Sequence, residues 1–362
     1  MRTKVVRIIM FFGSLIMLTS CVPNYSVEDA AMISAAGYDY VEEDKIKGTV
    51  SIPQFGRQET GGTMQEKKLT ASANTVREVH ARLQSKSSKP LVIGKLSVSM
   101  YSEELARKDL ADVIDNLGRD ARIGRNIFLV IVDGSTEQFL QKRYSQTETT
   151  AKYLTGIIKH NNESNFPTTN LHEYLYAYYA EGMDGFLPIM KTAKDHAKIT
   201  GIAFFKKGRL VYTIPYSKSF NFKIMNENFS QGIQDIEFKD RHVVMENIGS
   251  TVKYHVKGNH QTPKFLIDIH LTGIINEVSS LKKQQGPKVV KKMEKAFEQF
   301  YKEQCSLMVK EFQEYNVDPL GLGNVLKSRI RNFDNKKWKQ QYPNAQIDVK
   351  VNVEIVETGI SS

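Results

Sequence analysis

The sequence predicts a protein of two or three domains in which helices and strands are mixed. Even without a leader at positions 1–20, the chain is longer than one ordinary domain. Residues 90–132 follow a strand, helix, strand pattern, and residues 288–315 form a long amphipathic helix. Apolar residues then alternate with polar ones over 347–355, which is typical of a half-buried strand.

Residues 1–20 have the pattern of an export signal and are left out of the fold. Arg2, Lys4 and Arg7 make a basic start, and the apolar run Ile8–Leu18 follows. A span through a bilayer needs about 20 apolar residues, so this run is too short to cross. Its length suits a cleaved secretory signal.

The run Leu18-Thr19-Ser20-Cys21 resembles the bacterial lipobox. That resemblance implies a diacylglycerol on the Cys21 sulfur and cleavage between Ser20 and Cys21, so residues 1–20 form a lipoprotein signal peptide. An ordinary signal peptide and an uncleaved anchor are the alternatives. Each buried acyl CH₂ contributes roughly 0.8 kcal/mol, so two chains would hold the mature protein firmly on a membrane.

The chain is basic, with a formal net charge of +10 that becomes +7 without the three leader cations. The excess gathers at 282–283, 288–295 and 327–339. Such a balance suits a surface beside anionic lipid headgroups. Nucleic acid is the other usual partner of a basic protein, and the export signal argues against it.

The chain has two cysteines. If Cys21 carries lipid, Cys305 has no partner, which excludes a disulfide framework. Cys305 lies in the long helix, where a semi-buried apolar role is expected.

Two strands, a loop and a helix are expected after the leader. Ala30–Val41 and Lys45–Ile52 are the strands, joined by a turn at Glu43-Asp44. Gln54–Lys68 is polar and glycine-rich and predicts an exposed loop. Thr70–Gln84 predicts a helix, because Val76, Val79 and Leu83 are spaced by three and four positions.

The clearest local unit comes next. Pro90–Tyr101 predicts a strand, and Ser102 is placed to cap a helix that runs to about Leu117. Asn126–Val132 is continuously apolar, as expected of a strand buried on both faces. The unit is a β-α-β crossover.

Two helices and a linker complete the first part. The helices are expected at Thr147–His160 and Asn170–Glu181, and the charged segment Lys191–Lys198 is interpreted as a linker. We therefore expect an N-terminal domain at 21–195 and a C-terminal domain at 198–358, which could divide further.

The second part begins with a predicted hairpin, Gly201–Phe205 and Arg209–Pro215. The remaining expected elements are strands at 241–246, 251–256 and 264–277, the helix at 288–315, a helix capped by Asp318-Pro319, and the closing strand at 347–355.

Motifs for catalysis or metal binding fail. Gly56–Thr63 lacks the lysine of a phosphate-binding loop, since Gly62 stands in its place. His172-Glu173 begins a zinc pattern that Tyr176 breaks. Asp133, at the end of a buried strand, is interpreted as a helix cap. His242, His255, His260 and His270 match no standard metal spacing. The sequence therefore predicts no enzyme, cofactor or metal.

Four features resemble the Ger(x)C family of spore germination lipoproteins. They are the lipobox cysteine followed by Glu28-Asp29-Ala30 and Ala36-Gly37-Tyr38-Asp39, the run Gly201–Lys206, the turn Asp318–Gly323, and Trp338 ahead of Val349–Val353. The resemblance covers the whole mature chain. The family's usual Trp-Asp near the lipidated cysteine is replaced by Val22-Pro23-Asn24.

The resemblance implies a multidomain α/β fold with mixed sheets flanked by helices. It implies a C subunit of a nutrient germinant receptor on the outer face of the spore inner membrane, with A and B subunits as partners. It supplies no catalytic residues, and only Cys21 is carried over, as the lipid site. Direct nutrient binding stays open.

The rival interpretation is a solute-binding lipoprotein that delivers a ligand to a transporter. It predicts two similar lobes around a hinged cleft, whereas the two halves of this sequence look dissimilar. For the receptor subunit, the helix at 288–315 and the turn Asp318–Gly323 are candidate docking elements, with a purely scaffolding role as the alternative.

Overall fold

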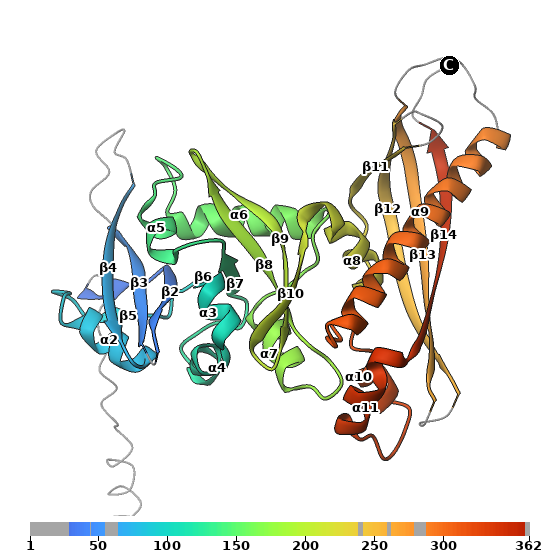
Figure 1. Cartoon of the computed structure of the whole chain (residues 1–362). Helices are drawn as coiled ribbons and strands as arrows, with labels where there is room; N and C mark the ends of the chain where they lie inside the picture. Colours follow the sequence, from blue (N-terminus) through green and yellow to red (C-terminus); the bar gives the residue numbers. More distant parts are fainter. Residues whose placement is uncertain are drawn as a thin grey trace, which may run out of the picture.

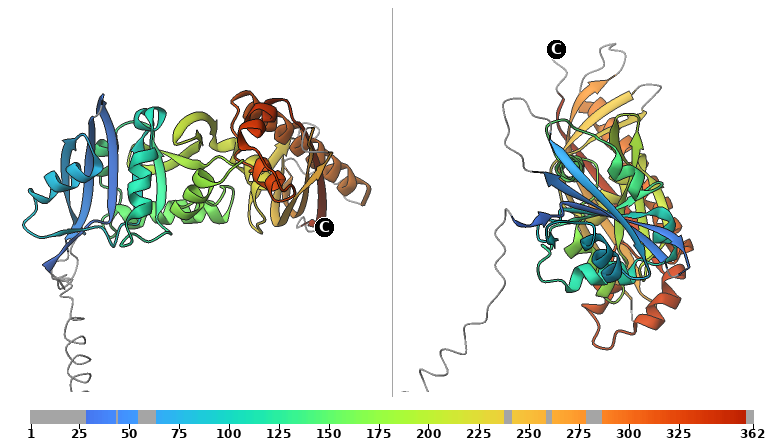
Figure 2. Two further views of the ribbon diagram at one scale, coloured as in Figure 1. Left: turned by 90° about the horizontal axis from the view of Figure 1, so that it is seen from below. Right: turned by 90° about the vertical axis from the view of Figure 1, so that its left-hand side faces the viewer.

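The structure, a computed structural model, describes residues 29–43, 45–54, 64–237, 242–258, 262–278 and 287–358. Its main features are an eight-stranded sheet in the first part of the chain and a four-stranded sheet in the second. The sheets follow one another along an elongated molecule (Figures 1 and 2). The predicted mixture of helices and mixed sheets is confirmed.

The large sheet has the strand order β10-β9-β8-β7-β6-β2-β3-β4. Neighbouring strands among β2, β6, β7 and β8 are parallel, and those at both edges are antiparallel. The bounds are β2 Ala35–Glu42, β3 Lys45–Gln54, β4 Gln65–Ala73, β6 Val98–Ser102, β7 Phe128–Val132, β8 Phe186–Ala193, β9 His196–Lys206 and β10 Arg209–Pro215. A separate parallel pair joins β1, Ala31–Met32, to β5, Leu91–Val92.

Helices cover both faces of the large sheet, and each face has its own apolar core. One face carries α2 (Val76–Gln84), α3 (Glu103–Lys108), α4 (Ala111–Arg119) and α7 (Leu171–Tyr179). The other carries α5 (Thr136–Gln141) and α6 (Thr150–Glu163). Five of these helices begin at a side chain that accepts a backbone N–H of the first turn, namely Thr75, Ser102, Ser135, Thr149 and Asn170.

The small sheet has the order β11-β12-β13-β14, and its last two strands are parallel. Its strands are β11 Ile233–Glu237, β12 His242–Lys257, β13 Lys264–Val278 and β14 Gln346–Thr358. The helix α9, Pro287–Glu314, connects β13 to β14 and packs on one face of the sheet (Figure 1). The opposite face is polar, with Lys253, His270 and Glu354 exposed.

A continuous apolar core joins the small sheet to the large one. Phe204 of β9 meets Phe312 of α9 with ring centroids 4.9 Å apart, and the ring of Phe222 in α8 (Ser219–Asn226) lies 5.1 Å from that of Phe204. The remaining helices, α10 (Leu322–Lys327) and α11 (Asn335–Gln341), lie between α9 and β14 in the sequence. The two halves therefore pack as one body.

Most of the predicted elements are confirmed. Strands β6 and β7 are parallel with helices between them, Ser102 caps α3, and α9 has the predicted length. The predicted single helix to Leu117 is two helices, because Asp109 and Leu110 interrupt it between α3 and α4.

Several element predictions are wrong. Residues 65–73 form β4, paired with β3, so the end of the predicted loop Gln54–Lys68 is a strand and only the second part of Thr70–Gln84 is helical. The strands predicted at 241–246 and 251–256 are one strand, β12. Pro90–Tyr101 contains the two short strands β5 and β6. Lys191–Lys198 is not a linker but the tip of the β8–β9 hairpin, where Lys191 pairs with Lys198. Residues 196–198 are therefore part of strand β9 in the large sheet. The domain boundary that the sequence places between 195 and 198 stays a prediction.

Candidate functional site

Three segments meet at a junction between the two halves, and two of them carry motif residues. The first is the loop 181–185 after α7, the second is the turn Val317–Gly323 after α9, and the third is α11 with Trp338. Figure 1 shows α10 and α11 beside the loop that follows α7. We call these segments the junction.

Asp318 is the centre of the junction and is 4 % exposed. Its Oδ1 accepts the backbone N–H of Leu322 at 3.0 Å, and its Oδ2 accepts that of Gly323 at 2.8 Å. The indole Nε1–H of Trp338 also donates to Oδ2, at 3.2 Å. The predicted capping role of Asp318 is confirmed, and the same carboxyl group holds the tryptophan in place.

The first half of the chain reaches the same point through residues 181–184. The backbone N–H of Asp184 donates to the carbonyl oxygen of Asp318 at 2.9 Å, and the N–H of Asp318 donates to Asp184 Oδ2 at 2.9 Å. The carbonyl of Gly182 accepts the N–H of Asn324 at 2.8 Å. Lys327 and Glu181 form an ion pair at 2.7 Å on the outside.

Glycine is required where the two backbones cross. Gly182 has φ +73°, and a Cβ there would overlap the carbonyl carbon of Gly323. A Cβ on Gly323 would in turn overlap Nε1 of Trp338. Gly321 also has a positive φ, +66°, at the start of α10. The glycines of the Asp318–Gly323 turn therefore allow close packing inside the protein.

The turn is not an exposed docking element. Val317 and Leu322 are fully buried, and Leu320 is nearly so. Its hydrogen bonds go to the other half of the same chain, which favours the scaffolding interpretation for this segment. The outward face of α9 is different, because Lys291, Lys295 and Lys302 are exposed on it.

The junction contains one buried acid, Asp318, and one half-buried acid, Asp184. Burial raises the pKa of Asp318 to about 7, against the opposing effect of its backbone N–H donors. Burial also raises the pKa of Asp184, opposed by the N–H of Asp318.

Thermal stability should therefore contain a contribution from Asp318 that falls with rising pH. Between about pH 4 and pH 7 the folded chain keeps a proton that the unfolded chain releases, so this group destabilises the fold progressively across that window. Melting the wild type and Asp318→Asn at several pH values tests this. The free energy of unfolding of the wild type minus that of Asp318→Asn should fall as the pH rises from about 4 to about 7. A difference that rises with pH across that window would contradict the assignment.

The second family motif, Ala36–Asp39, holds α5 against β2. Asp39 Oδ1 accepts the N–H of Thr136 at 2.7 Å, while Oδ2 accepts the N–H of Glu137 at 3.0 Å. Gly37 lies under the helix, because a Cβ there would come 2.6 Å from Thr136 Oγ1. Asp39 and Gly37 therefore position a helix on the sheet.

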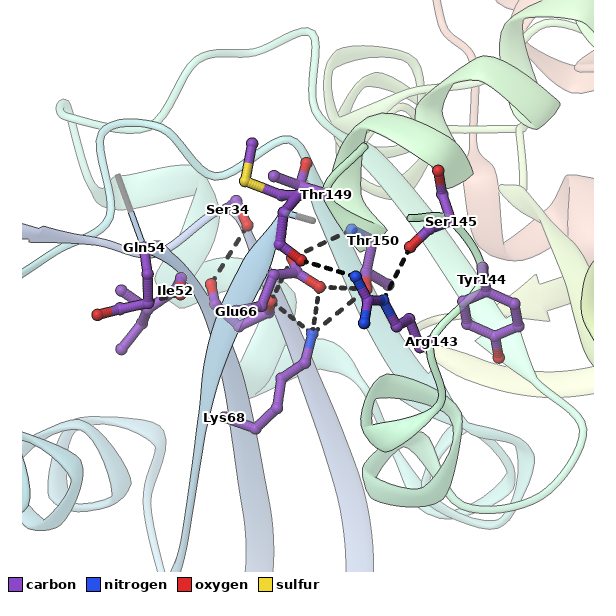
Figure 3. Close-up of polar contacts among 12 residues, drawn as sticks. Ser34, Ile52, Gln54, Glu66, Lys68, Arg143, Tyr144, Ser145, Thr149 and Thr150 are labelled. Atoms are coloured by element: carbon purple, nitrogen blue, oxygen red, sulfur yellow. Dashed lines mark hydrogen bonds and ion pairs between the residues drawn. The ribbon is translucent and has the colours of Figure 1, made fainter. Parts of the chain in front are cut away.

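A third polar cluster, which the sequence does not predict, joins the β3–β4 hairpin to α6 (Figure 3). Glu66 accepts from Lys68 Nζ at 2.7 Å, from the Thr150 hydroxyl at 2.6 Å and from the Thr150 N–H at 3.1 Å. Burial raises the pKa of Glu66, but hydrogen bonds from Lys68 and Thr150 outweigh it, so the pKa is lowered overall. The cluster is a structural ion pair at a helix N-terminus.

Asp133 does not have the predicted capping role. Ser135, two positions later, is the residue that caps α5, because its side chain accepts the N–H of Gln138. Asp133 is exposed and pairs with Lys191 at 2.8 Å. It is therefore a surface ion-pair residue at the end of β7.

Histidines of the small sheet lie next to an acidic side chain. His255 and His270 each lie 3.9 Å from Asp268 on the polar face of the small sheet. Among the residues that the structure describes, no group of three or more His, Cys, Asp or Glu side chains could hold a metal ion. His260 and Gly56–Thr63 lie outside the described residues.

The two cysteines have different positions. Cys305 is fully buried in α9, where its Sγ–H points to the carbonyl of Asn221 at 3.6 Å, and burial raises its pKa. It is more buried than the sequence predicts, as is typical of a structural cysteine. Cys21 lies outside the described residues. In the described ranges, no helix is long and apolar enough to cross a bilayer.

Two family profiles match the chain in succession. The profile described as the spore germination protein N-terminal domain matches residues 24–192, and the profile described as spore germination B3/GerAC-like, C-terminal, matches residues 200–359.

Individual relatives match over nearly their whole length. The chain is 28% identical to spore germination protein GerQC of Bacillus cereus, over 98% of this chain and 99% of that one. It is 23% identical to spore germination protein KC of Bacillus subtilis (strain 168), over 99% of this chain and 96% of that one.

A solved structure has the same fold. The crystal structure of the GerBC protein aligns with a TM-score of 0.60 at 16% identity, covering 89% of this chain and 96% of that one.

Proposed function

The chain belongs to the Ger(x)C family of spore germination proteins, and on that premise we propose that it is the lipid-anchored C subunit of a nutrient germinant receptor. In this role it lies on the outer face of the spore inner membrane beside an A and a B subunit. It acts through contacts with those subunits and carries out no reaction.

One observation carries the proposal. The two germination profiles follow each other in the family order over 24–192 and 200–359, so nearly all of the mature chain is accounted for by germination domains. A similar chain, named for spore germination, aligns from end to end.

The roles of the motif residues favour a binding role over catalysis. Asp318 bonds Asp184 of the first half and holds Trp338, and Asp39 fixes α5, so these residues are used in packing. The function is therefore expected to depend on the exposed surface of the protein, through contacts with other molecules. The solute-binding alternative needs two similar lobes, whereas the halves have sheets of eight and four strands.

The lipid anchor sets the distance between fold and membrane. The segment 22–28 separates Cys21 from the start of the described fold at Asp29. At about 3.5 Å per extended residue, this segment reaches about 25 Å at most. A lipid on Cys21 would therefore keep the large sheet close to the bilayer and raise its effective concentration near membrane partners.

Spores that lack this chain test the proposal. They should germinate slowly or not at all with the nutrient that the receptor senses, while a trigger that bypasses nutrient receptors should still act. Restoring the chain should restore the nutrient response. Normal responses to every nutrient tried, in a strain without a second copy of the receptor, would contradict the proposal.

A further inference from the structure

We propose that a cavity of about 520 Å³ in the first half of the chain binds a small amphiphilic anion, with an apolar body and one acidic group. The cavity lies between α2, strands β2 and β3, and the segment that follows α4. This inference goes beyond the receptor role and does not depend on it.

The floor of the cavity is apolar and comes from three parts of the fold. Val79 and Leu83 face it from α2, Ala36 and Val50 from the sheet, and Leu117 from α4. All five residues are buried, although they line an open space. The volume is within the range of about 300–1,000 Å³ in which proteins bind small molecules.

The rim of the cavity is cationic. Arg77, Arg119 and Arg122 line it, against one carboxylate, Asp120, so the lining has a formal charge of +2 with His80 neutral. Asp120 holds the Arg122 guanidinium by contacts of 2.9 Å and 2.6 Å, which fixes its orientation at the rim. Burial and the nearby Arg122 lower the pKa of His80, so its neutral imidazole can exchange hydrogen bonds with a ligand.

Arg77 is the cation available for a ligand. Arg119 pairs with Asp115 at 2.6 Å and Arg122 with Asp120, whereas Arg77 forms no ion pair with any described residue. The positive rim repels a cationic ligand. A neutral ligand would contact the apolar floor but would form no ion pair with the rim. A monoanion such as a carboxylate or sulfonate on a hydrocarbon or aromatic body satisfies both parts.

The test uses 1-anilinonaphthalene-8-sulfonate as the probe. The mature chain carrying Cys21→Ala is titrated, so that no lipid or detergent competes for the dye. Fluorescence should saturate at one equivalent. The neutral analogue N-phenyl-1-naphthylamine, which lacks the sulfonate, should bind at least tenfold more weakly, and added salt should weaken only the anionic probe.

Variants locate the binding to the cavity. Val76→Trp, at the half-buried first residue of α2, should place a bulky ring in the cavity and weaken saturable binding at least tenfold. Arg77→Gln should weaken binding several-fold, while Arg82→Gln on the same helix, outside the lining, should not change it. Melting curves confirm that each variant is folded.

Three results would overturn the inference. They are equal binding of the anionic and neutral probes, binding of unchanged affinity in a folded Val76→Trp variant, and no saturable binding to the parent chain.

Discussion

Replacing Gly182 by alanine should lower the stability of the whole molecule by about 3 kcal/mol or more. Gly182 has φ +73°, which costs a residue with a Cβ about 1–3 kcal/mol. The added methyl group would also overlap the backbone of Gly323, which cannot move aside as a flexible side chain can. With an unfolding entropy of about 2.1 cal/mol/K per residue, a chain of this size should have a melting temperature lower by roughly 4 °C or more.

Gly156→Ala is the matched control. Gly156 lies in the interior of α6, and nothing is within 4 Å of the position that its Cβ would take. Alanine is the better helix former by about 1 kcal/mol, so this change should leave stability unchanged or raise it. If the Gly182→Ala protein has the same melting temperature as the wild type, the junction does not hold the two halves together.

The second large effect is expected from Cys21→Ala. Without the thiol there is no site for the thioether-linked lipid that the lipobox resemblance implies. The protein should move from the membrane fraction to the soluble fraction of broken spores. Immunoblots of the two fractions measure the change.

Cys305→Ala is the control for that experiment. Cys305 is buried in α9 and far from the leader in sequence, so its removal should leave membrane retention unchanged. Retention of Cys21→Ala to the same extent as this control would contradict the lipid anchor.

Local patterns predict much of the fold correctly. The alternation over 347–355 identified β14, and the apolar spacing over 288–315 identified α9, because one buried face imposes its period on the sequence. The helix cap Ser102 was also readable, since it satisfies an N–H group close by in the sequence.

The features of the fold that the sequence did not predict depend on contacts between residues that are far apart in the chain. Strand β4 is half-exposed and carries Glu66 and Lys68, which look like loop residues until Thr150, 84 positions after Glu66, is placed against them. Likewise, the turn Asp318–Gly323 was readable as a motif. Its partner Gly182 belongs to the other half of the chain and has no local signal.

The cavity beside α2 was missed for a related reason. Val79 and Leu83 are spaced like core residues of an amphipathic helix, and nothing in that spacing distinguishes a filled core from an open one. Arg77, Arg119 and Arg122 come from two segments that the fold brings together.

Recovery of the intact complex tests the central claim most directly. The chain is tagged at its carboxyl terminus, spore inner membranes are cross-linked and solubilised in mild detergent, and the tagged protein is isolated. We expect A-type and B-type receptor subunits in comparable amounts from wild-type spores, and neither of them with Cys21→Ala. Isolation of the membrane-bound chain without either subunit, from spores that respond to nutrient, would contradict the account.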